Sequence, residues 1–255
     1  MSEPVQETFI SHLVELRDRL IRAIVAIILV FFGLVNWARD IYSLLAAPML
    51  AALPQGGHMI ATDVAGAFFV PMKVTLMVSF LIALPYVLYQ AWAFVAPGLY
   101  SHEKKLVLPL VVASVLLFFL GMAFAYFVVF PIVFGFVNRF APEGVAVMTD
   151  IDKYLSFVLS TFLAFGLTFE VPVIVVVLVR IGLVTVAKLR EIRPYVIVGA
   201  FVVGAVFTPP DVLSQFLMAM PLWLLYEVGV LVASVVARKA EQAAEAVTPA
   251  DGEAG

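Results

Sequence analysis

The stretch FLAFGLTFEVPVIVVV, residues 162–177, decides how this chain folds. It is apolar except for Thr168 and Glu170, and Pro172 follows two positions after the glutamate. A run of about 20 mostly apolar residues crosses roughly 30 Å of hydrocarbon. An ionisable group inside such a run costs roughly 2.5–3.5 kcal/mol on insertion scales. The stretch therefore predicts a membrane span with a carboxyl group that needs a polar partner.

The composition of the whole chain extends this prediction. Of its 255 residues, 64% are hydrophobic and only 13% are charged, and the mean hydropathy is +1.11. A soluble domain has about 25% charged residues. The sequence thus predicts an all-α integral membrane protein.

Several kinds of site are not expected. The chain has no cysteine, which excludes disulfides and thiolate chemistry. Its three histidines lie in separate polar segments, so no metal site is expected. The net charge of −3 gives no reason to expect nucleic acid as a partner. No phosphate-binding loop of the G-x-x-x-x-G-K-[ST] kind is present, and neither a cofactor nor enzymatic activity is expected.

Six transmembrane helices are expected along residues 1–237. They are placed at about 20–37, 75–94, 106–134, 154–179, 194–207 and 212–236. The fifth has only 14 residues, or about 21 Å of helix. The turn TPPD, residues 208–211, joins it to the sixth, and we expect both helices of this hairpin to be short. Residues 238–255 are polar and rich in alanine, and are expected to form a disordered tail.

The positive charges predict the orientation. Eleven of the fifteen Lys and Arg residues lie on one side of the expected topology. Because cytoplasmic loops carry the excess of Lys and Arg, both termini are expected in the cytoplasm.

The segment ETFISHLVELRDRLIRA, residues 7–23, has helical periodicity and leads into the first span. His12, Glu15 and Arg19 share one side of an expected amphipathic helix at the cytoplasmic interface. Two interpretations remain open. The helix is either a surface anchor with Glu15 paired to Arg19, or a docking surface for a partner.

The first cytoplasmic loop, WAFVAPGLYSHEKK at residues 92–105, contains Glu103. A loop glutamate is usually solvated. Alternatively, Glu103 and Glu15 lie on the same side of the membrane and together receive a basic ligand. An arginine fits a carboxylate because its planar fork donates two parallel hydrogen bonds.

Three further polar residues fall in or beside the spans. Glu170 either pairs internally, faces a polar cavity, or is protonated and hydrogen-bonded. Pro172 is expected to bend its helix. Asp211 is expected to cap the last helix, and Gln215 to hydrogen-bond a neighbouring helix.

Five motifs follow one another along the chain: HLVELRDRL (12–20), LPYVLYQAWAFVAPGLYSHEKK (84–105), GMAFAYFVVFP (121–131), FGLTFEVPV (165–173) and RPYVIVGAFVVGAVFTPPDVLSQ (193–215). They resemble the TatC family, the multi-spanning core of the twin-arginine protein translocase. They occur in the order typical of that family, over residues 8–235. The resemblance implies six helices in a concave cup in the bacterial cytoplasmic (inner) membrane.

The resemblance also implies roles for particular residues. Twin-arginine signal peptides of folded precursors would bind Glu15, Glu103, Arg17 and Phe94. Pro48 and Asp211 would act on the periplasmic side, and Glu170 would be the intramembrane polar site. The single-span subunits TatA and TatB would dock at Thr208 and Gln215, in an oligomeric TatBC complex.

The function that follows is a receptor for export driven by the proton-motive force. The alternative is a proton-coupled secondary transporter with Glu170 as its relay. Only the intramembrane carboxylate favours that alternative, and the absence of an internal repeat speaks against it.

Overall fold

The structure is a computed structural model that describes residues 3–51, 60–63, 65–95, 107–139, 150–207 and 212–247. The all-α class is confirmed, since the described residues form helices and, outside them, one isolated bridge between Ile60 and Asp150. The helices are α1 (Glu3–Leu34), α2 (Ala38–Ala51), α3 (Gly66–Val95), α4 (Val107–Phe124), α5 (Phe130–Arg139), α6 (Ile151–Phe169), α7 (Val171–Arg180), α8 (Val186–Glu191), α9 (Arg193–Phe207) and α10 (Val212–Val247). A 3-10 turn, Val35–Trp37, joins α1 to α2, and a π-helical turn, Ala125–Val129, joins α4 to α5.

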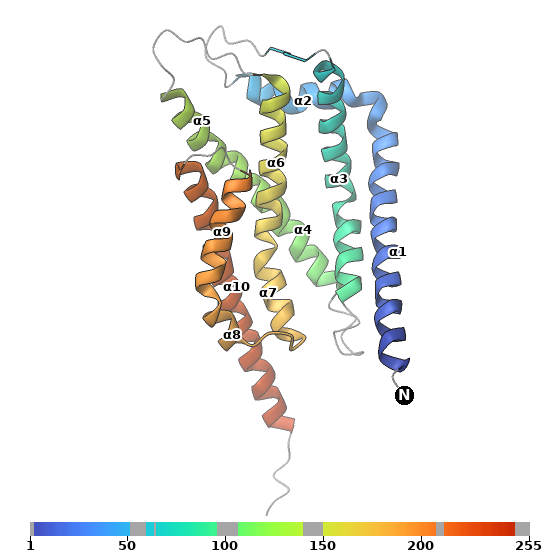
Figure 1. Ribbon diagram of the computed structural model, residues 1–255, viewed down its shortest axis with the longest axis vertical. Helices are drawn as coiled ribbons and strands as arrows, with labels where there is room; N and C mark the ends of the chain where they lie inside the picture. The colour runs from blue at the N-terminus through green and yellow to red at the C-terminus, as the bar shows by residue number, and fades with distance from the viewer. Residues whose placement is uncertain are drawn as a thin grey trace, which may run out of the picture.

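The long helices stand side by side as an open wall. Figure 1 shows α1, α3, the α6–α7 pair and the α9–α10 pair in that order, with α4 and α5 crossing the wall obliquely. Helix α1 begins and α10 ends at the same face, which we call the terminal face. Helix α2 lies across the opposite face, which we call the α2 face.

Five helical stretches of the described residues are long and apolar enough to cross a membrane. They are Ile10–Leu44, Phe68–Val95, Val107–Gly135, Ile151–Arg180 and Gln215–Lys239. The expected multi-span membrane architecture is therefore confirmed. Helix α9 has 15 residues and is shorter than these stretches, as the sequence predicted for the fifth helix.

The amphipathic segment at residues 7–23 does not form a separate surface helix. It is the first part of α1, which continues from Glu3 to Leu34 without a break. No proline or glycine falls between Val5 and Phe32, so nothing in the sequence interrupts the backbone hydrogen bonds of this helix.

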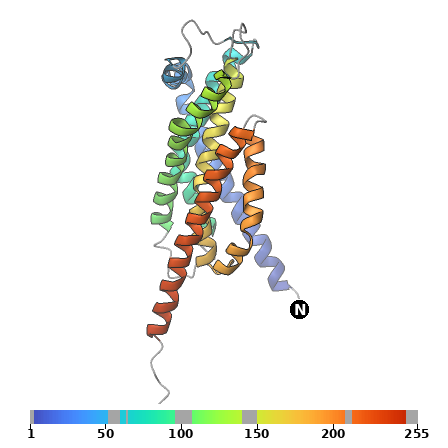
Figure 2. The same cartoon turned by 90° about the vertical axis from the view of Figure 1, so that its left-hand side faces the viewer.

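The sixth helix corrects two predictions. We expected it to be short, but α10 has 36 residues and contains a 25-residue apolar stretch. Relative to the other helices it is displaced toward the terminal face, beyond which it projects (Figure 2). The expected disordered tail is also wrong for residues 238–247, which belong to α10. Their alanine and glutamate content favours a helix even though large apolar side chains are almost absent.

The fourth expected span consists of two helices. Helix α6 ends at Phe169 and α7 begins at Val171, so the interruption falls on Glu170. Pro172, at the second position of α7, has no N–H to continue the α6 hydrogen-bond ladder. At the other end of α7, Gly182 has φ of +73°, a conformation that glycine adopts without strain.

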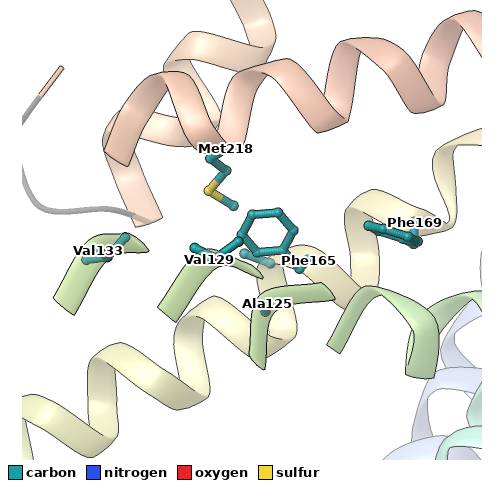
Figure 3. Packing of buried hydrophobic residues seen from close by; sticks show 7 residues of the cluster. Ala125, Val129, Val133, Phe165, Phe169 and Met218 are labelled. Carbon is teal, nitrogen blue, oxygen red and sulfur yellow. The ribbon is translucent and has the colours of Figure 1, made fainter. Parts of the chain in front are cut away.

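The centre of the wall is closely packed around α6. Phe165 and Met218 point toward one another next to Ala125 and Val129, which come from the π-helical turn (Figure 3). A Cβ added at Gly121 of α4 would lie 2.4 Å from the carbonyl oxygen of Phe165. The absence of a side chain at residue 121 therefore allows α4 to approach the end of α6, just before the interruption.

Candidate functional site

The first polar cluster lies on α1 toward the terminal face. Both Nε and Nη2 of Arg19 donate to Oε1 of Glu15, at 2.9 and 2.7 Å. This is the i,i+4 pair that one interpretation of the sequence predicted. The second carboxylate oxygen, Oε2, lies 3.9 Å from Nδ1 of His12. The Glu15 side chain keeps 35% of its exposed area, so it is accessible to a ligand.

Helix α3 completes this cluster. The rings of His12 and Phe94 are stacked, with centroids 4.3 Å apart and planes 17° from parallel. Nη1 of Arg19 lies 3.4 Å from Oε1 of Gln90, which is buried. Gln90 and Phe94 are four residues apart and therefore share one face of α3. We call His12, Glu15, Arg19, Gln90 and Phe94 the α1–α3 cluster.

The structure brings together two of the four residues expected to bind a signal peptide. Glu15 and Phe94 belong to the α1–α3 cluster. Arg17 does not, because two residues of helix rotate it about 200° away from Glu15. Its Nη2 is 2.8 Å from Oδ1 of Asp18, and its side chain is 65% exposed. Glu103 lies outside the described residues.

Glu170 is the second candidate site. It is 4% exposed, and neither carboxylate oxygen has a hydrogen-bond partner within the described residues. Ser114 of α4 is a polar side chain next to it. A buried polar group without a partner is unfavourable, by an amount that exceeds the stabilisation from one ordinary hydrogen bond. The position of Glu170 at the α6–α7 interruption therefore requires an explanation other than packing.

A buried hydrogen bond connects Ser114 to α3. Nε1 of Trp92 donates to Oγ of Ser114 at 2.9 Å, and both residues are buried. The Trp92 side chain also belongs to an apolar cluster with Val111 of α4 and with Val173 and Val177 of α7. Trp92 therefore contributes to the packing between α3, α4 and the helix that begins directly after Glu170.

At the α2 face, a polar anchor holds α6. Oδ1 of Asp150 accepts hydrogen bonds from the backbone N–H groups of Asp152 and Lys153. Its Oδ2 accepts from both the N–H and the hydroxyl of Thr62. The Thr62 hydroxyl, followed by these backbone groups, lowers the pKa of Asp150 to about 2. Nearby, Nζ of Lys73 lies 2.6 Å from Oδ1 of Asp152, which links α3 to α6.

The remaining predicted site residues lie at or beyond the limits of the described structure. Pro48 is within α2, and its side chain is not described. Thr208 and Asp211 lie outside the described residues. Gln215 is near the beginning of α10, where its Nε2 donates to the carbonyl of Phe201 in α9 at 2.9 Å. Its expected hydrogen bond to a neighbouring helix is thus formed within the α9–α10 hairpin.

Three participants, Gln90, Trp92 and Ser114, are not predicted from the sequence. The sequence places His12 and Arg19 on the side of Glu15, but it does not predict the contacts from His12 to Phe94 and from Arg19 to Gln90. A polar residue in an apolar run was the available signal for Gln90 and Ser114, as it was for Glu170. Within the described residues, no group of three or more His, Asp or Glu side chains could hold a metal ion.

These features define a class of protein. The chain is a polytopic helical membrane protein with a half-exposed carboxylate cluster at the terminal face and a buried carboxyl group at a helix interruption. Neither site has the nucleophile, base or metal arrangement of an enzyme within the described residues.

Comparisons with known proteins identify the family. Residues 11–221 match the family described as Sec-independent protein translocase protein (TatC), and the chain belongs to this family. It is 57% identical over 235 residues to the TatC protein of Azotobacter chroococcum mcd 1, covering 92% of each chain. It is also 57% identical over 230 residues to that of Escherichia coli K12, covering 90% of this chain and 89% of the relative.

A solved structure agrees with the fold. A crystal structure described as the twin arginine translocase receptor TatC superposes with a TM-score of 0.78 at 41% identity. The superposition covers 88% of this chain and 98% of the other. The family predicted from the motifs is thereby confirmed.

Proposed function

We propose that this chain is the receptor subunit of a twin-arginine protein translocase in a bacterial cytoplasmic membrane. Its terminal face would lie in the cytoplasm, with six spans within residues 1–237. The α1–α3 cluster would bind the paired arginines of signal peptides on folded precursors. The observation that carries the proposal is the half-exposed Glu15, whose Oε2 is not used by Arg19.

The chemistry of the α1–α3 cluster fits a guanidinium ligand. Oε2 of Glu15 can accept a charge-assisted hydrogen bond while Arg19 stays on Oε1. The stacked His12–Phe94 pair offers an aromatic surface for a second guanidinium or for an apolar side chain. A lysine would be a poorer ligand, because its ammonium is compact and strongly hydrated. Glu103 is proposed as the partner of the second arginine.

Other members of the translocase would assemble on the α9–α10 hairpin. Single-span TatA and TatB subunits are proposed to dock at Thr208 and Gln215, giving an oligomeric TatBC complex. Gln215 already donates to Phe201, so a docking helix would use the remaining acceptor on its side-chain amide. Pro48 and Asp211 are proposed to act at the α2 face, which would be periplasmic.

Export would be driven by the proton-motive force, in a complex to which this chain contributes no catalysis. The relatives quoted above are named as protein translocase components, which supports this role. They give no support to the alternative of a proton-coupled solute transporter.

Glu15→Gln tests the proposal. It keeps the shape of the side chain and removes the charge, and a hydrogen bond to a charged group contributes about 1.5–3 kcal/mol. We expect the affinity for a labelled twin-arginine signal peptide to fall by at least about tenfold, the factor that corresponds to 1.4 kcal/mol. Fluorescence anisotropy on the purified chain in nanodiscs measures it.

Asp18→Asn is the matched control. It removes a carboxylate one turn away on α1, whose described partner is Arg17 and not a member of the cluster. We expect this variant to bind the peptide as the unmodified chain does. Equal loss of binding in both variants, or no loss in Glu15→Gln, would show that the cluster is not the peptide site.

A further inference from the structure

Trp92 and Ser114 stand between the two candidate sites. Helix α3 carries Gln90 and Phe94 on the face that meets α1, and Trp92 lies between them in sequence. Two residues of helix rotate a side chain by about 200°, so Trp92 points away from α1, toward α4. The last turns of α3 therefore contact the α1–α3 cluster on one side and Ser114 on the other.

Ser114 is suited to connect Trp92 with Glu170. Its oxygen accepts the Trp92 N–H, and its own hydroxyl proton remains to be donated. It faces the Glu170 carboxylate, which has no hydrogen-bond partner among the described residues. A small movement of Ser114 or Glu170 would complete a chain from the Trp92 N–H through the Ser114 hydroxyl to the carboxylate. All three groups are buried, so water does not compete for these bonds as it does at a surface.

The last part of α3 is also held less firmly than its beginning. Pro85 removes the backbone hydrogen bond to the carbonyl of Leu81, which weakens the helix just before residues 86–95. Beyond Pro85, α3 and α1 are joined by a long polar contact, in which Nη1 of Arg19 lies 3.4 Å from Oε1 of Gln90. The beginning of α3, in contrast, is held to α6 by the 2.6 Å ion pair of Lys73 and Asp152.

We propose that Ser114 is a positioning residue that couples the α1–α3 cluster to Glu170. Binding of a signal peptide shifts residues 86–95 of α3, and with them Trp92. Ser114 then turns its hydroxyl onto the Glu170 carboxylate at the α6–α7 interruption. This inference rests on the proposed function. It assigns to Trp92 and Ser114 the role of connecting the α1–α3 cluster to Glu170.

Trp92 supplies its own readout, since the emission of an indole responds to the hydrogen bond and polarity at its N–H. The chain has three tryptophans, so Trp37→Phe and Trp223→Phe leave Trp92 as the only one. This background is placed in nanodiscs with a synthetic twin-arginine signal peptide that lacks tryptophan. Anisotropy of a label on the peptide measures binding independently of Trp92.

We expect the Trp92 emission to shift on saturation with the peptide. Ser114→Ala should abolish the shift while the peptide still binds, and Ser114→Thr, which keeps a hydroxyl, should retain it. Because coupling between sites is reciprocal, Glu170→Gln should change the peptide affinity by about fivefold or more. Ser79→Ala is the matched control, since it removes another buried serine hydroxyl, which donates to the Thr75 carbonyl.

The possible results separate the inference from the proposed function. If the peptide binds and Trp92 emission does not change, or changes equally in Ser114→Ala, the coupling is wrong and the receptor function stands. If the peptide binds neither the unmodified chain nor the background that keeps only Trp92, the proposed function fails and the coupling fails with it. A loss of the shift in Ser79→Ala as well would assign the effect to general loosening of α3 and overturn the role of Ser114.

Discussion

Helix α1 and the α6–α7 pair are both long apolar segments, but they are packed very differently. In α1, 6% of the most apolar 18 residues are buried, whereas the corresponding value for α6–α7 is 50%. Helix α1 lies at the edge of the wall against α3, and α6–α7 lies at its centre (Figure 1). The same kind of sequence therefore makes a peripheral helix in one place and a core in the other.

The two carboxylates reflect this difference. Glu15 on α1 is half-exposed and already paired with Arg19. Glu170 between α6 and α7 is buried and has no hydrogen-bond partner within the described residues. A group at the edge can exchange its partner for a ligand at little cost. A carboxyl group in the core still lacks a hydrogen-bond partner, and apolar packing cannot provide one.

Gly121→Ala should have the largest effect on stability, because it tests the packing of the centre. The new Cβ would lie 2.4 Å from the Phe165 carbonyl oxygen, so α4 or α6 must shift. Overpacking of this kind costs about 1–3 kcal/mol. We expect a lower melting temperature in detergent, measured by intrinsic fluorescence.

Gly33→Ala on α1 is the control for this prediction. No atom lies within 4 Å of a Cβ built there, and alanine favours a helix over glycine by about 1 kcal/mol. We expect the melting temperature to stay the same or rise. If both variants lost the same stability, the contrast between edge and centre would be incorrect.

Glu170→Leu should separate stability from function. Leucine removes an unpartnered buried carboxyl group and suits the apolar surroundings, so the melting temperature should rise. If the carboxylate has the role proposed above, export of a twin-arginine reporter should fall by more than about tenfold. A tenfold fall corresponds to about 1.4 kcal/mol. A purely structural Glu170 would instead give a stabilised chain with normal export, as measured in cells that lack the native subunit.

Local sequence was enough to predict part of this architecture. The interruption at Glu170 follows from a charge and Pro172 in an apolar run, and the Glu15–Arg19 pair follows from their i,i+4 spacing. The contacts of Phe94 with His12 and of Trp92 with Ser114 could not be predicted in the same way. They depend on which faces α1, α3 and α4 turn toward each other, and helical periodicity in an apolar segment does not specify this.

The tail shows what composition alone misses. The polar composition of residues 238–247 predicts disorder, although helix propensity and continuity with α10 suffice to form a helix there. The part of Arg17 in peptide binding stays a prediction. It rests on the family resemblance, and the geometry of α1 turns this side chain toward Asp18.

Arg19→Gln should sharpen the account of α1, with a smaller effect. It frees Oε1 of Glu15 from its internal partner, and an i,i+4 ion pair contributes only about 0.3–0.5 kcal/mol. We therefore expect about a twofold gain in affinity for the twin-arginine peptide, measured by anisotropy at low salt. A tenfold loss would mean that Arg19 holds Glu15 in the binding geometry and does not compete with the ligand.

The smallest effect is expected at the beginning of α6, where Asp150 ties the central helix to Thr62. Its pKa is lowered from 3.8 to about 2, since the Thr62 hydroxyl and the surrounding N–H groups favour the charged carboxylate in the folded chain. The stabilisation is therefore complete above pH 4 and is lost as the pH falls toward 2. In Asp150→Asn, which cannot titrate, we expect a slightly lower melting temperature at pH 6 and a smaller further decrease between pH 4 and pH 2 than in the unmodified chain. Parallel decreases in the two chains would assign the acid sensitivity to other carboxylates and would show that the Asp150 anchor does not contribute to it.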